Sequence, residues 1–272
     1  MKPKAFDYMR ANSVDEAVAG LAKTGEGARI LAGGQSMVPI LNFRLADPEL
    51  LIDISRIKEL DYIKIDGNAV QIGAATRQAK VMAWPELADR IPLLAKALPH
   101  VGHFQTRSRG TICGSLAHAD PSSEIPLCLA MLDGEVILKS ASGERRLAAA
   151  DFQTGMLSTA KRDDEMLVAA RFPIAEAGTG YAFDEMAQRR GDFAIVAVAA
   201  TVSASKIRLG VGGVADKPTI VEWGNIAGDE LDDALNAFAW ELGGYDDVHA
   251  TARYRRELVR RLGRRVIEEA RT

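Results

Sequence analysis

Apolar and polar positions along the first third of the chain follow two different periods, which predict a helix and several strands. Residues 14–21 have apolar side chains at helical spacing. Ser13, with Glu16 three positions later, has the pattern of a capping box, so a helix is expected to begin here. An Asp66-Gly67-Asn68 sequence predicts a hairpin turn. Short apolar runs predict strands at residues 29–32, 51–54 and 69–73.

The remaining pattern continues the alternation and then ends in helices. A run of small residues and glycines at residues 175–180 is the best candidate for a linker. Helices that alternate with strands, followed by strands and then a helical end, indicate an α/β or α+β protein. Helices are predicted at residues 76–79, 91–98 and 124–132, strands at residues 135–138, 144–147, 165–172, 195–202 and 206–211, and further helices after them.

Two segments centred on glycine interrupt this pattern where apolar stretches give way to small and polar residues. They are residues 32–36 (Ala-Gly-Gly-Gln-Ser) and residues 111–121. Glycine lets backbone N–H groups approach a ligand closely, and successive N–H groups form a nest for anions. We therefore predict that the two segments clamp a pyrophosphate. The sequence lacks the complete dinucleotide-binding fingerprint and the P-loop motif, which argues against a Rossmann protein and a P-loop NTPase.

Composition and charge narrow the class of protein further. A formal net charge of −3 argues against a general nucleic-acid binder, and no apolar run is long enough to span a bilayer. The first eight residues are not followed by the apolar region of a signal peptide, so a cytoplasmic location is expected. Two cysteines are too few for a disulfide framework or an iron–sulfur cluster, and four scattered histidines do not form a metal site.

Four stretches, residues 31–36, 111–121, 189–194 and 209–215, occur together in the order and spacing of one family. On these stretches the chain resembles the FAD-binding medium subunit of molybdenum-containing hydroxylases, the carbon monoxide dehydrogenase and xanthine dehydrogenase family. The likeness runs over nearly the whole chain and implies an α+β fold. Residues 1–176 would form a vanillyl-alcohol-oxidase (PCMH)-type FAD-binding domain of two subdomains. Residues 177–272 would form a C-terminal domain with a three-stranded antiparallel sheet and helices.

The resemblance also implies a function for the chain within a larger complex. It would bind FAD non-covalently and pass electrons from a small subunit with two [2Fe–2S] clusters to an external acceptor. A large subunit would hold the molybdenum cofactor and hydroxylate the substrate, in a heterotrimer that is commonly doubled. Aromatic N-heterocycles, purines, aldehydes and carbon monoxide all remain open as substrates. Two other interpretations are a stand-alone FAD oxidase of the same fold and a scaffold or nucleic-acid-binding protein that uses the basic C-terminal helix.

The resemblance assigns cofactor contacts to this chain, with no catalytic residue and no metal ligand. Gln35 stands where some related flavoproteins attach FAD covalently through histidine, so covalent attachment is not expected. The implied FAD-binding residues are Leu31, Ala32, Gly33, Gly34, Gln35, Ser36, Val101, Gly102, Gly110, Thr111, Cys113, Gly114, Ser115, Ala117, Asp120, Glu124 and Leu167.

At two places the chain departs from the family pattern. Cys113 replaces the first glycine of the second segment, so we expect either an ordinary backbone conformation there or a reshaped loop. Asp184 and Glu185 stand where many relatives have a lysine that approaches the flavin. A cation beside the flavin stabilises its reduced anionic form. The acidic pair therefore argues against redox chemistry that depends on such a cation, including the reduction of NAD⁺.

Overall fold

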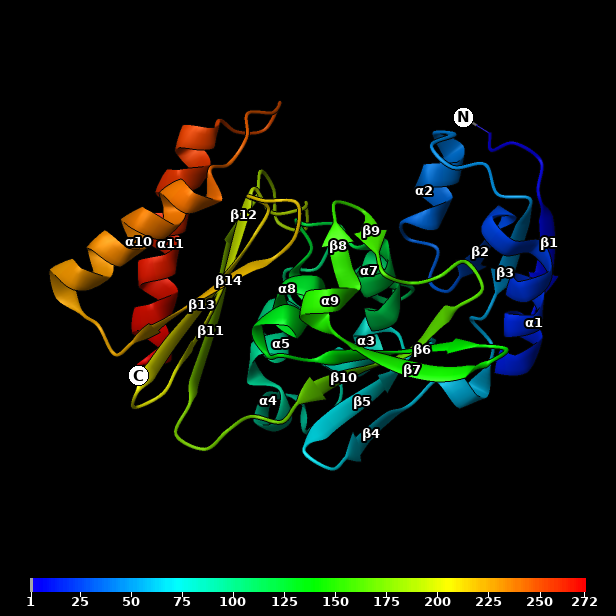
Figure 1. Cartoon of the computed structure of the whole chain (residues 1–272), viewed down its shortest axis with the longest axis horizontal. Helices are drawn as coiled ribbons and strands as arrows, with labels where there is room; N and C mark the ends of the chain where they lie inside the picture. The colour runs from blue at the N-terminus through cyan, green and yellow to red at the C-terminus, as the bar shows by residue number, and fades with distance from the viewer. Residues whose placement is uncertain (1) are drawn as a thin grey trace.

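The computed structural model of the chain describes residues 2–272. Over these residues the strands form four sheets, and Figure 1 shows the largest sheet between an N-terminal unit and a C-terminal unit. The N-terminal unit is built on a parallel sheet, whereas the pairings of the other sheets are antiparallel. The α+β class expected from the sequence is confirmed.

The N-terminal unit begins with the helix expected after Ser13. The N–H of Glu16 donates to Ser13 Oγ at 3.1 Å, while Glu16 Oε2 accepts from the backbone N–H of Asn12 at 2.8 Å. The apolar side of this helix is buried. The elements are β1 (Asp7–Arg10), α1 (Val14–Thr24), η1 (Gly25–Gly27), β2 (Ala28–Leu31), α2 (Met37–Asn42), β3 (Leu50–Asp53) and η2 (Lys58–Leu60), with sheet order β1-β3-β2.

The middle unit has a five-stranded sheet in the order β4-β5-β10-β6-β7. Its first hairpin turns at Gly67, whose φ of +63° is a conformation that favours glycine. The strands are β4 (Ile63–Asp66), β5 (Ala69–Gly73), β6 (Glu135–Ser140), β7 (Gly143–Ala148) and β10 (Met166–Pro173), with a ribbon of β8 (Gln153–Gly155) and β9 (Ser158–Thr159). The helices are α3 (Gln78–Met82), α4 (Leu87–Arg90), α5 (Pro92–Ala97), α6 (Phe104–Arg107), α7 (Ile112–His118), α8 (Glu124–Met131) and α9 (Ala149–Phe152).

The C-terminal unit has a four-stranded antiparallel sheet, so the expected count of three strands was wrong. Both outer strands pair over most of their length: Gly180 lies opposite Val202, and Thr219 lies opposite Val211. Of the two outer strands, β14 contains Ile220, Val221 and Trp223, residues that favour a strand. The elements are β11 (Gly180–Met186), β12 (Val196–Val202), β13 (Lys206–Gly212), β14 (Thr219–Gly224), α10 (Gly228–Leu242) and α11 (Ala252–Ala270).

Strand β12 joins two hydrophobic cores, and every one of its residues is buried. Ala197 and Ala199 belong to the large core that fills the N-terminal and middle units. Val196 and Val198 belong to a second core shared with α10 and α11. Alternate residues of a strand point to opposite faces, so the C-terminal sheet has helices of the middle unit on one face and its own helices on the other.

A buried arginine of the last helix is linked, through Gly213, to the end of the second glycine segment. Arg255 of α11 is 2% exposed and donates to the carbonyls of Ile195 at 2.5 Å and Gly213 at 2.8 Å. Its second terminal nitrogen, Nη2, donates to Asp247 Oδ2 at 2.6 Å. The N–H of Gly213 in turn donates to the carbonyl of Pro121 at 2.8 Å. Arg255 thus fixes the turn that touches the end of residues 111–121.

No helix within residues 2–272 combines the length and the apolar character needed to cross a bilayer.

Candidate functional site

The first glycine segment leaves the carboxyl end of β2 and enters α2. Gly34 has a φ of +73°, and the Gln35 side-chain amide donates to the carbonyl of Gly33 at 3.2 Å. Within residues 2–272, no protein acceptor receives the backbone N–H groups of Gly33, Gly34 or Gln35. Consecutive N–H donors without protein partners at a turn with positive φ are the arrangement that binds anions. Leu31 and Ser36 flank this turn and are half-buried.

The second glycine segment was predicted to be a loop, but it contains α7. Thr111 is its N-cap, and the Thr111 Oγ1 accepts from the N–H of Gly114 at 2.9 Å. Ile112 and Leu116 are buried residues of this helix, and their burial explains why the stretch of small residues is ordered. Ser115 is half-buried within the helix, whereas Ala117 lies on its exposed side.

Cys113 has the ordinary backbone conformation that was one of the two expectations, because it lies in the first turn of α7. Its side chain is 3% exposed, and its thiol donates to the carbonyl of Ile72 at 3.6 Å. Burial raises the pKa of this thiol far above its usual range. Cys113 is therefore a core residue, and it has none of the features of a reactive thiol.

The first glycine segment is in direct contact with residues 109–110, which lead into the second segment. A Cβ added to Gly33 would lie 2.7 Å from the Cα of Gly110 and 2.9 Å from the carbonyl carbon of Arg109. Real Cβ atoms essentially never approach other atoms so closely. Only glycine at position 33 allows the backbone of residues 109–110 to pass this close, so residues far apart in sequence form one cradle.

A cavity of about 160 Å³ opens beside this contact. Three arginines from separate parts of the chain line it, together with one residue from each glycine segment, Ala32 and Thr111. Guanidinium groups match phosphate oxygens in charge and in geometry, and this donor set therefore fits a diphosphate. The lining residues are Ala32, Ser55, Arg56, Ala75, Arg77, Arg109 and Thr111.

A buried glutamine, Gln78, contacts the start of the second glycine segment and the glycine before it. The N–H of Gln78 donates to the carbonyl of Gly110 at 2.8 Å, and its side-chain amide lies 3.5 Å from the carbonyl of Thr111. A Cβ at Gly110 would lie 3.0 Å from Gln78 Oε1. That oxygen is buried and has no hydrogen-bond partner among the described residues. A buried polar atom without a partner beside the cradle is consistent with a binding site for a polar ligand.

Glu124 lies in the first turn of α8 and is only 4% exposed. Burial raises the pKa of its carboxyl to about 8, with a further contribution from the Glu185 carboxylate. Asp120, just before this helix, accepts the N–H of Ser122 at 2.8 Å through Oδ1, so its side chain forms a turn and does not cap α8. Glu185 on β11 lies near His100, with 3.3 Å between its Oε1 and Nδ1 of the imidazole.

The remaining candidate residues lie apart from the basic cavity. Val101 is 8% exposed, and Gly102 follows it with a φ of +52°, in the left-handed region that favours glycine. The carbonyls of both residues accept from Arg107 Nη1, at 2.8 and 2.9 Å. Leu167 is 6% exposed and lies opposite Leu138 in the five-stranded sheet.

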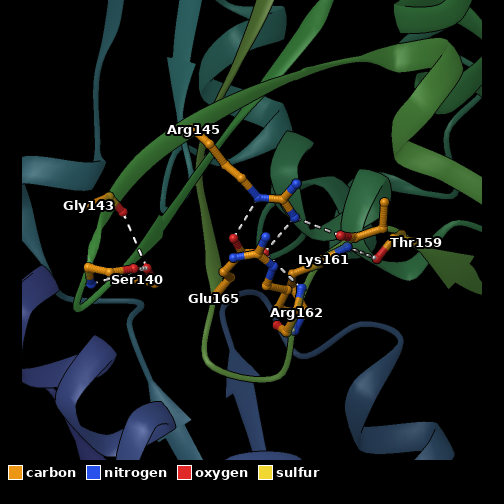
Figure 2. Close-up of polar contacts among 9 residues, drawn as sticks. Ser140, Gly143, Arg145, Thr159, Lys161, Arg162 and Glu165 are labelled. Atoms are coloured by element: carbon orange, nitrogen blue, oxygen red, sulfur yellow. Dashed lines mark hydrogen bonds and ion pairs between the residues drawn. The ribbon is translucent and has the colours of Figure 1, made fainter.

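A cluster of charged residues fixes the loop that leads into β10 and Leu167 (Figure 2). Arg145 makes a bidentate pair with Glu165, at 2.6 Å and 2.8 Å, and also donates to the carbonyl of Ala160. The hydrogen bond from Arg145 lowers the pKa of Glu165. The backbone N–H of Arg162 donates to the same carboxylate at 2.7 Å. Lys161, in this loop, has its pKa lowered mainly by burial, with a contribution from Arg29 on β2.

The sequence analysis missed Arg56, Arg77, Arg109 and the pairing of His100 with Glu185. Two local signals were available. Arg77 lies within the helix predicted at residues 76–79, and Arg109 stands directly before Gly110. Arg77 also forms an isolated antiparallel bridge with Thr111, a contact between distant residues that no local pattern reveals.

Two family models together match most of the chain. The model described as "FAD binding domain in molybdopterin dehydrogenase" matches residues 4–175. The model described as "CO dehydrogenase flavoprotein C-terminal domain" matches residues 181–270.

Known proteins are similar over almost the full length. The chain is 36% identical to the 6-hydroxypseudooxynicotine dehydrogenase complex subunit alpha of Paenarthrobacter nicotinovorans, covering 99% of this chain and 96% of that protein. It is 35% identical to the carbon monoxide dehydrogenase medium chain of Afipia carboxidovorans, covering 99% and 98%. A solved structure of reconstituted CO dehydrogenase from Oligotropha carboxidovorans contains a similar chain, with a TM-score of 0.95, 33% identity and coverage of 100% and 99%.

Proposed function

Since this chain belongs to the family of FAD-binding medium subunits of molybdenum-containing hydroxylases, we propose that residues 31–36 and 110–115 hold the diphosphate of FAD. The chain is the flavin subunit of a multi-subunit molybdenum-dependent oxidoreductase. The contact of Gly33 with residues 109–110 carries the proposal, because it holds the first glycine segment against the residues that lead into the second. When bound, FAD accepts electrons from an iron–sulfur subunit and passes them to an external acceptor.

The residues of the cradle bind and orient the cofactor. The free N–H groups of Gly33, Gly34 and Gln35 would donate to one phosphate, and the hydroxyl of Ser36 adds a further donor. Arg77 and Arg109, which line the cavity, would neutralise the diphosphate charge. Gln35 is no nucleophile, which supports non-covalent attachment.

The other candidate residues extend the proposed site away from the diphosphate. We propose that Val101, Gly102 and Leu167 provide apolar contacts, and that Glu124 and Asp120 accept hydrogen bonds from FAD hydroxyl groups. Cys113, Gly114 and Ser115 shape the site through the first turn of α7, whose cap is Thr111. The low exposure of Val101, Leu167 and Glu124 supports a dry environment around a bound ligand.

We also propose that the chain divides into an FAD-binding domain, residues 1–176, and a C-terminal domain, residues 177–272. The family matches support this boundary, because one ends at residue 175 and the other begins at residue 181. Residues 174–179 lie outside the strands β10 and β11, as a linker would. The second hydrophobic core begins at Ala182, which supports a separate folding unit.

The partners that we propose are a large subunit with the molybdenum cofactor and a small subunit with two [2Fe–2S] clusters, in a heterotrimer that doubles. The relatives named above as a complex subunit and a medium chain support an assembly of several subunits rather than a stand-alone oxidase. A cytoplasmic location is proposed with it. Both cysteines are free and buried in the structure, which suits a reducing compartment.

The visible absorption spectrum of the purified chain, before and after acid precipitation, tests the proposed function. We expect oxidised-flavin bands that move to the supernatant, since the cofactor is held without a covalent bond. A colourless chain that takes up no added FAD would contradict the proposal. Iron and molybdenum that copurify with the chain from its native source would distinguish the complex from a stand-alone oxidase.

A further inference from the structure

A groove of about 470 Å³ lies between the outer strand β14 of the C-terminal sheet and the helices α8 and α9 of the middle unit. The middle unit lines it mainly with apolar side chains, which include Leu116, Pro126, Leu129, Ala149 and Phe152. Residues 217–222 form the opposite side. None of the lining residues is among the candidate contacts for FAD, so this β14 groove is separate from the proposed cradle.

The backbone of β14 has a free edge that faces outward from the sheet. In an antiparallel sheet, successive residues of a strand bond alternately to one neighbouring strand and to the other. The N–H of Ser203 donates to the carbonyl of Lys206 at 2.9 Å, so the even-numbered residues of β13 bond to β12 and the odd-numbered residues bond to β14. The register of β13 with β14 then points the backbone groups of Ile220 and Glu222 away from β13. Within residues 2–272, no other strand pairs with that edge.

The charge on this edge is neutralised inside the chain. A charged residue on an edge strand ordinarily protects it from pairing with another strand. Glu222 is the charged residue of β14, and its Oε2 lies 3.1 Å from Lys206 Nζ and 3.7 Å from Arg208 Nε. Arg208 also donates to both carboxylate oxygens of Asp133, at 2.7 and 2.8 Å. Since Asp133 follows α8 and Arg208 lies on β13, this pair holds the two sides of the groove together.

The shape and chemistry of the β14 groove fit one extended segment of polypeptide. The strand edge offers main-chain hydrogen bonds, and the apolar side receives alternate side chains of an added strand. The β14 edge of a second copy is itself flanked by α8 and α9, so a single segment fits the groove better than a second copy does. Lys217 is exposed beside the groove and makes no ion pair with a described residue, which favours a carboxylate on the segment.

We propose that the β14 groove is the docking site for an extended segment of another subunit of the complex, which adds a strand to the outer edge of β14. The inference deepens the proposed function and rests on it, because the occupant is a subunit of the same complex. The segment has apolar side chains at alternate positions, directed at α8 and α9. It also has an aspartate or glutamate beside Lys217.

A proline on the free edge tests the proposal in the whole complex. Glu222→Pro removes an N–H that points away from β13, so it blocks the added strand and spares the native sheet. We expect the tagged variant, purified from cells that express all subunits, to retain about tenfold less of the other subunits, the effect of one unmade hydrogen bond in a buried interface. Glu222→Ala is the matched control, since it loses the same ion pairs and keeps the N–H. It should retain far more of the other subunits than Glu222→Pro does, and both variants should carry as much flavin as the native chain.

Two measurements on the native sequence do not depend on the folding of a variant. Amide hydrogen exchange at Ile220 and Glu222 should be at least about tenfold slower in the purified complex than in the full-length chain alone. Carbodiimide treatment of the complex should join Lys217 to a carboxylate of another subunit, which mass spectrometry identifies.

Equal exchange at these amides in the complex and in the chain alone would overturn the inference, as would full retention of the other subunits by Glu222→Pro. Protection of the same amides by dimers of the chain alone would also overturn it, because a second copy would then be the occupant. In each of these cases the flavin and the copurifying iron and molybdenum leave the proposed function intact. If the native chain carries no flavin and copurifies with neither metal, the proposed function fails and the inference fails with it.

Discussion

Gly33 lies so close to Gly110 that a Cβ added to Gly33 would be 2.7 Å from the Cα of Gly110. This contact joins the turn after β2 to the residue that precedes the N-cap of α7. The proposed cradle therefore depends on the absence of a side chain at one position.

Gly33→Ala should disrupt the contact between the first glycine segment and residues 109–110. The added Cβ meets backbone atoms of residues 109–110, which cannot move aside as the end of a flexible side chain can. We expect FAD binding to weaken by at least about tenfold, because overpacking of this kind costs about 1–3 kcal/mol. The Kd for FAD, measured by fluorescence, tests this.

Gly224→Ala is the matched control for that substitution. A Cβ at Gly224 on β14 would have no heavy atom within 4 Å. This variant should therefore bind FAD as the native chain does. Equal affinity of the Gly33→Ala variant and this control would show that residues 32–36 do not form part of the binding site.

Arg77→Ala should weaken FAD binding by about tenfold, the effect of losing one charge-assisted hydrogen bond to a phosphate. Arg77→Lys should restore only part of the affinity, because a lysine has the charge without the planar fork. The dependence of the Kd on ionic strength should also be weaker in the alanine variant. Arg253→Ala, at an exposed position on α11, is the control, and an effect as large as that of Arg77→Ala would contradict a specific role.

Glu165→Gln should lower the free energy of unfolding by about 2 kcal/mol near neutral pH, since it removes a buried partner of the partly exposed Arg145. The pairing lowers the pKa of Glu165 below 4.5, so its contribution is complete above that pH and is lost as the pH falls through the folded-state value. Urea unfolding at about pH 7.5 and about pH 3 measures the difference. A difference that stays constant between the two pH values would show that the charge of Glu165 contributes nothing.

Both cysteines should be unreactive in the folded chain. Burial raises the pKa of the Cys113 and Cys128 thiols, and only thiolates react readily. Ellman's reagent should label neither residue in native buffer and both residues in concentrated urea. Rapid labelling of Cys113 in the native chain would revive the interpretation of a functional thiol.

Much of the fold could be predicted because its signals are local. The Ser13 cap, the turn at Gly67 and the buried strand β12 each depend on a few adjacent residues, and the structure has all three. Helix α7 was missed because it is short and contains glycine and serine, which favour a helix less than most residues do. The burial of Ile112 and Leu116 is what stabilises that helix, and burial depends on the tertiary structure.

The candidate site could be predicted only in part, for the same physical reason. Glycine segments are visible in sequence because a close backbone approach requires a specific residue type. Arg56, Arg77 and Arg109 resemble any exposed arginine until the fold gathers them around one cavity. The environment of Glu185 likewise depends on His100, a residue from a distant part of the chain.

The chain of hydrogen bonds from Arg255 through Gly213 to Pro121 has a consequence for the order in which the protein matures. During synthesis, residues 111–121 emerge well before α11, and until then Gly213 has no guanidinium to hold its carbonyl. The end of the second glycine segment is thus secured only after the last helix has docked. A partly made chain therefore lacks the support that Arg255 and Gly213 give to the Pro121 end of this segment.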